Sequence, residues 1–171
     1  RSTKRKQARL SRGNTFNNPV SWSDYAFAYD VMCEANPAYS ANLSLFMSWL
    51  DGLKLPASPK ICDVGAGTGN YVLNVAKQYP DAEIFHVERD PTMNRLASQK
   101  YRDNQITNVS FVTADVNDHK WDDNSLDVIL AVNALYTLPD PNFVIKKIFS
   151  ALKPGGHFFT IDLGREMRVL D

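Results

Sequence analysis

Long apolar runs are missing from this sequence. None approaches the roughly 18 residues that a membrane-spanning helix needs, so we expect no membrane span. No secretory signal peptide is visible, although the chain starts at Arg1 and not at Met. Cysteine is scarce: Cys33 and Cys62 lack the spacing of a metal or redox motif, so we predict no metal site. Together these absences predict a protein of the reducing cytoplasm.

The formal net charge is zero, because a positive charge on a short first segment cancels a negative charge on the rest of the chain. Residues 1–12 carry six basic and no acidic side chains, whereas the other 159 residues carry 13 basic and 19 acidic ones. We interpret residues 1–19, which are mostly polar, as a basic flexible arm. The rest of the chain has no basic patch interleaved with aromatic residues, so we do not expect nucleic acid as a partner.

Glycine is rare, and its distribution is uneven. The chain has eight glycines, and three of them fall within residues 65–69, in the segment ICDVGAGTGN at 61–70. Apolar residues lead into this segment, and the apolar spacing after it is helical, which predicts a strand, a tight turn and a helix start. Glycine permits positive φ and close approach of a ligand, and the helix start exposes N–H groups. The unit therefore suits a nucleotide-like ligand.

Strand and helix patterns alternate after residue 58. We predict strands over 60–64, 82–87, 109–113, 126–132 and 156–161, with helices over 70–78, 91–101 and 142–152. This order indicates an α/β fold, a Rossmann-like doubly wound sheet of mainly parallel strands flanked by helices. Ligands of such sheets lie beyond the carboxyl ends of the strands.

Two aromatic-rich helices are predicted before the first strand, over 21–32 and 38–51. We therefore divide residues 20–171, a single domain, into an N-terminal helical lid segment (20–58) and a Rossmann-like cofactor-binding core (59–171).

The glycine segment also indicates which ligand to expect. A dinucleotide fingerprint needs glycine or alanine at position 70, where this chain has Asn70. The acid and three glycines from Asp63 to Gly69 instead resemble motif I of the class I S-adenosylmethionine-dependent methyltransferases, small-molecule type. The resemblance continues to residue 162 and includes the turn at 152–158 before the last strand. It implies S-adenosyl-L-methionine as cofactor and a small-molecule acceptor, methylated on O, N or C.

Two acids at strand ends match cofactor positions of this family. Glu88 can hydrogen-bond both ribose hydroxyls, and Arg89 beside it flanks the adenine or points to solvent. Asp115 matches the residue that receives the exocyclic amine of adenine, with the backbone N–H of Val116 on a ring nitrogen. A solvated strand-end acid for Glu88 and a helix N-cap for Asp115 are the structural alternatives.

The segment after the fourth strand is the last cofactor element that the resemblance implies, with Asn133 and Ala134 lining the cofactor. The predicted cofactor-binding residues are Asp63, Gly65, Ala66, Gly67, Gly69, Asn70, Glu88, Arg89, Asp115, Val116, Asn133 and Ala134.

The acceptor site is less well defined. Tyr25 and Tyr29 share one helix face, which we predict packs over the cleft, although both rings can equally pack on the flank of the sheet. Tyr136 is either a wall of the acceptor pocket or part of the core. Methyl transfer is an in-line displacement that depends mainly on positioning, so a base is needed only for a protonated nucleophile. We assign no catalytic residue.

Two other functions stay open: a non-enzymatic S-adenosylmethionine-binding or partner subunit, and a nicotinamide-dependent oxidoreductase. The family's sheet has seven strands and the pattern gives five, so the last strands are missing from this prediction. We expect either that the protein continues beyond Asp171 or that a second copy, in a homodimer, covers the apolar edge of the fifth strand.

Overall fold

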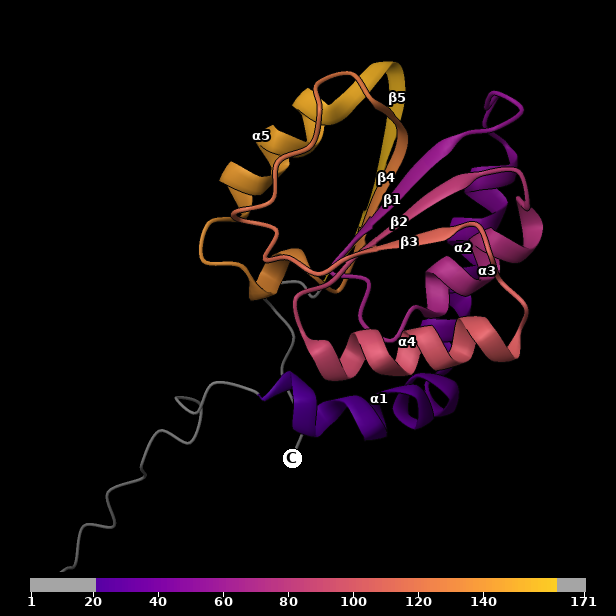
Figure 1. The fold of residues 1–171 in the computed structure, drawn as a ribbon, viewed down its shortest axis with the longest axis vertical. Coiled ribbons are helices and arrows are strands. Elements are labelled where there is room, and N and C mark those ends of the chain that lie inside the picture. Colours follow the sequence, from indigo (N-terminus) through magenta and orange to yellow (C-terminus); the bar gives the residue numbers. More distant parts are fainter. Residues whose placement is uncertain (1–20, 163–171) are drawn as a thin grey trace, which may run out of the picture.

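The computed structural model describes residues 21–162. Within this range, one five-stranded sheet is covered by helices on both faces (Figure 1). The elements are α1 (Trp22–Ala35), α2 (Pro37–Asp51), β1 (Lys60–Val64), α3 (Asn70–Gln78), β2 (Glu83–Val87), α4 (Pro91–Asp103), β3 (Val109–Val112), β4 (Leu126–Val132), η2 (Leu135–Thr137), α5 (Pro141–Ala151) and β5 (Leu152–Ile161). The predicted arm at 1–19 and the final residues 163–171 lie outside the described residues.

The strand order is β3-β2-β1-β4-β5, and every neighbouring pair is parallel. From β1 the chain proceeds outward through β2 and β3, and then returns to the other side of β1 for β4 and β5. The order therefore reverses between β1 and β4, which is where doubly wound sheets bind their ligands. This arrangement confirms the predicted Rossmann-like fold.

Each face of the sheet has its own apolar core. On one face, buried residues of α2, α3 and α4, among them Phe46, Val72 and Ala97, pack against β1 and β2. On the other face, Val144 and Ile148 of α5 pack against β4. The run from Leu126 to Ala131 in β4 is buried throughout, as expected of a central parallel strand. Helix α1 lies outside this arrangement, alongside α4 (Figure 1).

The largest difference from the predicted elements is at β5, which begins at Leu152 and not at residue 156. Leu126 pairs with Leu152 and Val128 with His157, so the intervening residues of β5 form an irregularity in the pairing. Gly155 lies within it with φ 80°, a conformation that glycine adopts without strain. The glycines predicted to form a turn before the strand therefore form a bulge inside it.

Two features of the described residues bear on the remaining predictions. Beyond β4, strand β5 has no pairing partner among residues 21–162. None of the helices within this range is long and apolar enough to span a bilayer.

Candidate functional site

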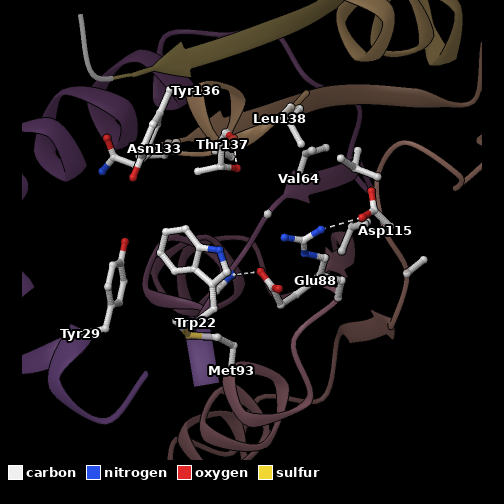
Figure 2. Close-up of a pocket in the computed structure, with 18 of the residues that line it drawn as sticks. Trp22, Tyr29, Val64, Glu88, Met93, Asp115, Asn133, Tyr136, Thr137 and Leu138 are labelled. Atoms are coloured by element: carbon white, nitrogen blue, oxygen red, sulfur yellow. Dashed lines mark hydrogen bonds and ion pairs between the residues drawn. The ribbon is translucent and has the colours of Figure 1, made fainter. Parts of the chain in front are cut away.

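A cavity of about 530 Å³ lies at the carboxyl ends of the strands, where the strand order reverses (Figure 2). Its volume is in the range of small-molecule and cofactor sites. The residues that line it are Trp22, Tyr25, Tyr29, Val64, Gly65, Gly67, Val87, Glu88, Arg89, Met93, Ala114, Asp115, Val116, Val132, Asn133, Ala134, Tyr136, Thr137 and Leu138. Loops after four strands meet helix α1 and η2 around this space.

The loop between β1 and α3 forms the floor of the cavity. Gly65, Gly67 and Gly69 have φ of 72°, 55° and 77°, so all three adopt the left-handed conformation. A β-carbon at Gly65 would lie 2.8 Å from the β-carbon of Ala134, and one at Gly69 would lie 2.0 Å from the Tyr101 hydroxyl oxygen. At Gly67 the same atom would meet nothing within 4 Å. Protein packing therefore requires glycine at the two ends of the loop, whereas its middle faces open space.

Glu88 fastens this loop to the end of β2. Its Oε2 accepts a hydrogen bond from the Gly67 backbone N–H at 3.0 Å, and its Oε1 accepts one from the Asp90 N–H at 2.8 Å. Each carboxylate oxygen has a further lone pair for a ligand. Glu88 is half-buried and lines the cavity. The two backbone hydrogen bonds hold its carboxylate in one orientation.

Arg89 and Asp115 form an ion pair of 2.8 Å at the edge of the cavity (Figure 2). The other oxygen of Asp115 accepts hydrogen bonds from the backbone and side-chain N–H groups of Asn117, at 2.9 and 2.7 Å. The pKa of Asp115 is held below its ordinary value, mainly by the hydrogen bond from the Asn117 backbone N–H and further by Arg89. Asp115 thus has a capping role in its turn and also lines the cavity.

Asp63 lies in β1 with 3% of its surface exposed and is not among the residues that line the cavity. Burial, and secondly the negative charge of Glu88, raise the pKa of Asp63 to about 8. The protonated carboxyl group is therefore favoured at neutral pH.

Aromatic side chains line a further part of the cavity, alongside aliphatic ones such as Met93 and Leu138. Trp22, Tyr25 and Tyr29 line it from α1. The ring of Tyr25 makes edge-to-face contacts with both of the others, with centroid distances of 6.0 Å to Trp22 and 5.6 Å to Tyr29. In Figure 2, Trp22 and Tyr29 lie on one side of the cavity and Tyr136, from η2, lies on the other. Burial raises the pKa of all three tyrosines that line the cavity, so their hydroxyl groups stay neutral near pH 7.

Most of the predicted site residues meet at this cavity, and four do not. Asp63, Ala66, Gly69 and Asn70 lie outside its lining. The three histidines lie outside it as well; His86 is fully buried, with Nδ1 2.8 Å from the Tyr101 hydroxyl. No base is therefore assigned from the structure.

Several lining residues were not predicted, chiefly Trp22, Met93, Thr137 and Leu138. The spacing of Trp22, three residues before Tyr25 on the same helix, was a signal that could have identified it. The other three follow no motif, because their positions depend on how α4 and η2 pack.

Comparison with known proteins is consistent with this geometry. Residues 57–169 match the family model described as a methyltransferase domain. The sterol 24-C-methyltransferase erg6 of Aspergillus fumigatus is 35% identical over 100 residues, which are 58% of this chain and 26% of that protein. The chain spans between 26% and 50% of the length of four curated relatives that it matches.

Solved structures show the same fold. A SAM-dependent methyltransferase from Aquifex aeolicus aligns with a TM-score of 0.70 at 18% identity, covering 87% of this chain and 77% of that one. The [4+2]-cyclase SpnF aligns with a TM-score of 0.67 at 22% identity, covering 81% of this chain and 58% of that one. At these identities the likeness concerns the fold alone. Because the family match takes in the glycine loop and all five strands, the chain belongs to the class I S-adenosylmethionine-dependent methyltransferase family.

Proposed function

We propose that the protein transfers the methyl group of S-adenosyl-L-methionine to a small acceptor that binds beneath helix α1. The observation that supports this most directly is the division of the cavity into two chemically different parts. One part consists of the glycine loop and the polar strand ends, and the other of four aromatic rings from α1 and η2, with aliphatic side chains such as Met93 and Leu138 completing the lining. The first part suits the cofactor, and the second suits an acceptor next to it.

The polar part offers a partner for each portion of the cofactor. The loop leaves room for the amino-acid end at Gly67, because a β-carbon there would meet nothing within 4 Å. Glu88 accepts from the ribose hydroxyls with the lone pairs left free by its two backbone bonds. Asp115 and Val116 hold the adenine edge, with Asp115 kept ionised by Asn117 and Arg89.

The aromatic part favours an acceptor without net negative charge. Among the described lining residues the charged side chains are Glu88, Arg89 and Asp115, and the single cation, Arg89, is already paired with Asp115. An acceptor carboxylate or phosphate would enter without a partner, which is costly away from water. Flat rings and ammonium groups, in contrast, gain from stacking or from cation–π contacts with Trp22 and the tyrosines. The rings do not distinguish between O, N and C as the acceptor atom.

The mechanism that follows is one of positioning. The bound cofactor supplies an electrophilic methyl group, and the chain's part is to align an acceptor lone pair with it and to exclude water. The aromatic rings of α1 cover the cavity and serve both purposes. Since the tyrosines that line it stay neutral and protonated at pH 7, they do not serve as the base that a protonated acceptor would need.

A transfer assay tests this function. Labelled S-adenosylmethionine is incubated with the protein and a panel of neutral aromatic, amine and carboxylate acceptors. We expect label in the neutral or amine acceptors and none in the carboxylates. Cofactor binding without transfer to any acceptor would favour the alternative of a non-enzymatic binder, or another reaction on the same fold. Absence of cofactor binding would contradict the proposal altogether.

Two further parts of the proposal concern setting and assembly. Cys33 and Cys62 are buried free thiols, which agrees with a reducing cytoplasm. A second copy of the chain covering the outer edge of β5 stays a prediction, which the mass in solution by light scattering checks.

A further inference from the structure

One carboxylate, that of Asp30, joins helix α1 to the glycine loop. Its Oδ1 accepts hydrogen bonds from the Thr68 hydroxyl at 2.5 Å and from the Asn70 side-chain amide at 3.0 Å. Its Oδ2 forms an ion pair of 2.8 Å with Lys100, which also donates to the Asn70 side-chain oxygen. Four side chains from three different parts of the chain thus form one closed network.

The network lies at the point where loop and helices meet. Thr68 and Asn70 flank Gly69 at the start of α3, and Lys100 belongs to α4. Thr68 is 1% exposed, and the Asp30 and Lys100 side chains are 33% and 18% exposed. Hydrogen bonds to an ionised group are roughly twice as strong as neutral ones, and shielding from solvent reduces their screening by salt.

The charge state of Asp30 agrees with a stable network. Burial acts to raise the pKa of its carboxyl group, but Lys100, Thr68 and Asn70 outweigh that effect and hold the pKa below its ordinary value. Asp30 is therefore ionised at neutral pH, when the network is complete.

Asp30 is also next to the part of α1 that lines the cavity. It follows Tyr29 directly, and Trp22, Tyr25 and Tyr29 line the cavity whereas Asp30 does not. The first turn of α1 is attached separately, by a hydrogen bond of 2.7 Å from the Ser23 hydroxyl to the Asp90 carboxylate. Asp30, in contrast, connects α1 to the glycine loop, through its hydrogen bonds with Thr68 and Asn70.

We propose that Asp30 is a positioning residue of the cofactor site, which acts through Thr68 and Asn70 to hold the glycine loop and the aromatic face of α1 in one fixed arrangement. This rests on the proposed function, since the arrangement matters for a ligand that contacts both parts. The affinity for the cofactor then depends on a residue that never touches it. Loosening either part loosens the other.

Two variants of α1 test this. Asp30→Asn keeps the size of the side chain and removes its charge, whereas Asp24→Asn removes an equal charge from an exposed position on the same helix. In ligand-free protein we expect amide hydrogen exchange of residues 23–35 and 66–72 to be at least about ten-fold faster in Asp30→Asn. Asp24→Asn should match the parent protein in both segments.

Calorimetric titration with S-adenosylhomocysteine, performed well below the unfolding temperature, gives the second readout. We expect Asp30→Asn to bind about ten-fold more weakly or worse, and Asp24→Asn to bind like the parent. Thr68→Val, which removes the hydroxyl donor from the loop, should weaken binding as well. The double variant should bind little worse than Asp30→Asn, because both substitutions break one network.

The outcomes separate this inference from the proposed function. If the parent protein does not bind S-adenosylhomocysteine, the proposed function is wrong, while faster exchange of both segments in Asp30→Asn would still support their coupling. Unchanged exchange in Asp30→Asn would overturn the inference. So would faster exchange with undiminished affinity, because the network would then hold the helix without positioning the site.

Discussion

Two glycines of the same loop should respond very differently to alanine. A β-carbon at Gly69 would lie 2.0 Å from the hydroxyl oxygen of Tyr101 and 2.7 Å from the ring carbon that bears it. Tyr101 is 3% exposed and is held by His86, so it has little room to retreat. A β-carbon at Gly67 would meet nothing within 4 Å. Gly67→Ala is therefore the matched control for Gly69→Ala.

The magnitudes follow from these distances. Both positions have positive φ, so alanine costs about 1–2 kcal/mol at each through backbone strain alone. At Gly69 the contact with Tyr101 adds a further cost of about 1–3 kcal/mol, typical of an overpacked interior. For a domain of this size 1 kcal/mol corresponds to about 2–4 °C in melting temperature. We expect Gly67→Ala to lower the melting temperature by about 2–8 °C and Gly69→Ala by about 4–20 °C.

The two variants should also differ in their affinity for ligand. Gly67 lines the cavity and Gly69 does not, so Gly67→Ala should lose affinity for S-adenosylhomocysteine despite its milder effect on stability. Thermal unfolding followed by circular dichroism, with and without ligand, measures both effects. Equal melting temperatures for the two variants would refute the packing of Tyr101 against the loop. Unchanged ligand affinity in Gly67→Ala would refute the placement of the cofactor.

Three other substitutions test separate parts of the site. Glu88→Ala removes the acceptor for the ribose hydroxyls and should weaken cofactor binding by about 1–3 kcal/mol in calorimetry. Cofactor analogues that lack these hydroxyls should then bind this variant almost as well as the cofactor does. Asp63→Asn concerns stability: burial raises the pKa of Asp63 from 3.8 to about 8, so the folded state binds a proton that the unfolded state has lost. The parent should therefore lose stability through this group between pH values of about 4 and 8, and the advantage of Asp63→Asn in urea unfolding should grow over that range. Trp22 is the tryptophan that lines the cavity, so S-adenosylhomocysteine should change the fluorescence of the parent, and an equal change in Trp22→Phe would argue against a lid.

Much of the fold could be predicted because its signals are local. The alternation of apolar strands with helical spacing gave the order of elements, and proline at the start of α4 and after α1 marked boundaries within a few residues. The exception, the early start of β5, has a physical cause. A bulge held by cross-strand pairing to β4 depends on the neighbouring strand and has no signature of its own beyond Gly155.

The candidate site divides in the same way. Gly65, Gly67, Glu88 and Asp115 were predicted from motifs at strand ends, because the topology brings those ends together. The network around Asp30 was not predicted. Its members are 38, 40 and 70 positions away along the chain, and they meet only because α1 packs on α4 and against the loop.

The central claim is that the cavity at the β1–β4 reversal binds S-adenosylmethionine through the glycine loop. Calorimetric titration of the protein with S-adenosylhomocysteine, and separately with NAD, tests it most directly. We predict saturable binding of one S-adenosylhomocysteine per chain, its loss in Gly67→Ala, and no binding of NAD. Absence of S-adenosylhomocysteine binding, or tighter binding of NAD, would contradict the account.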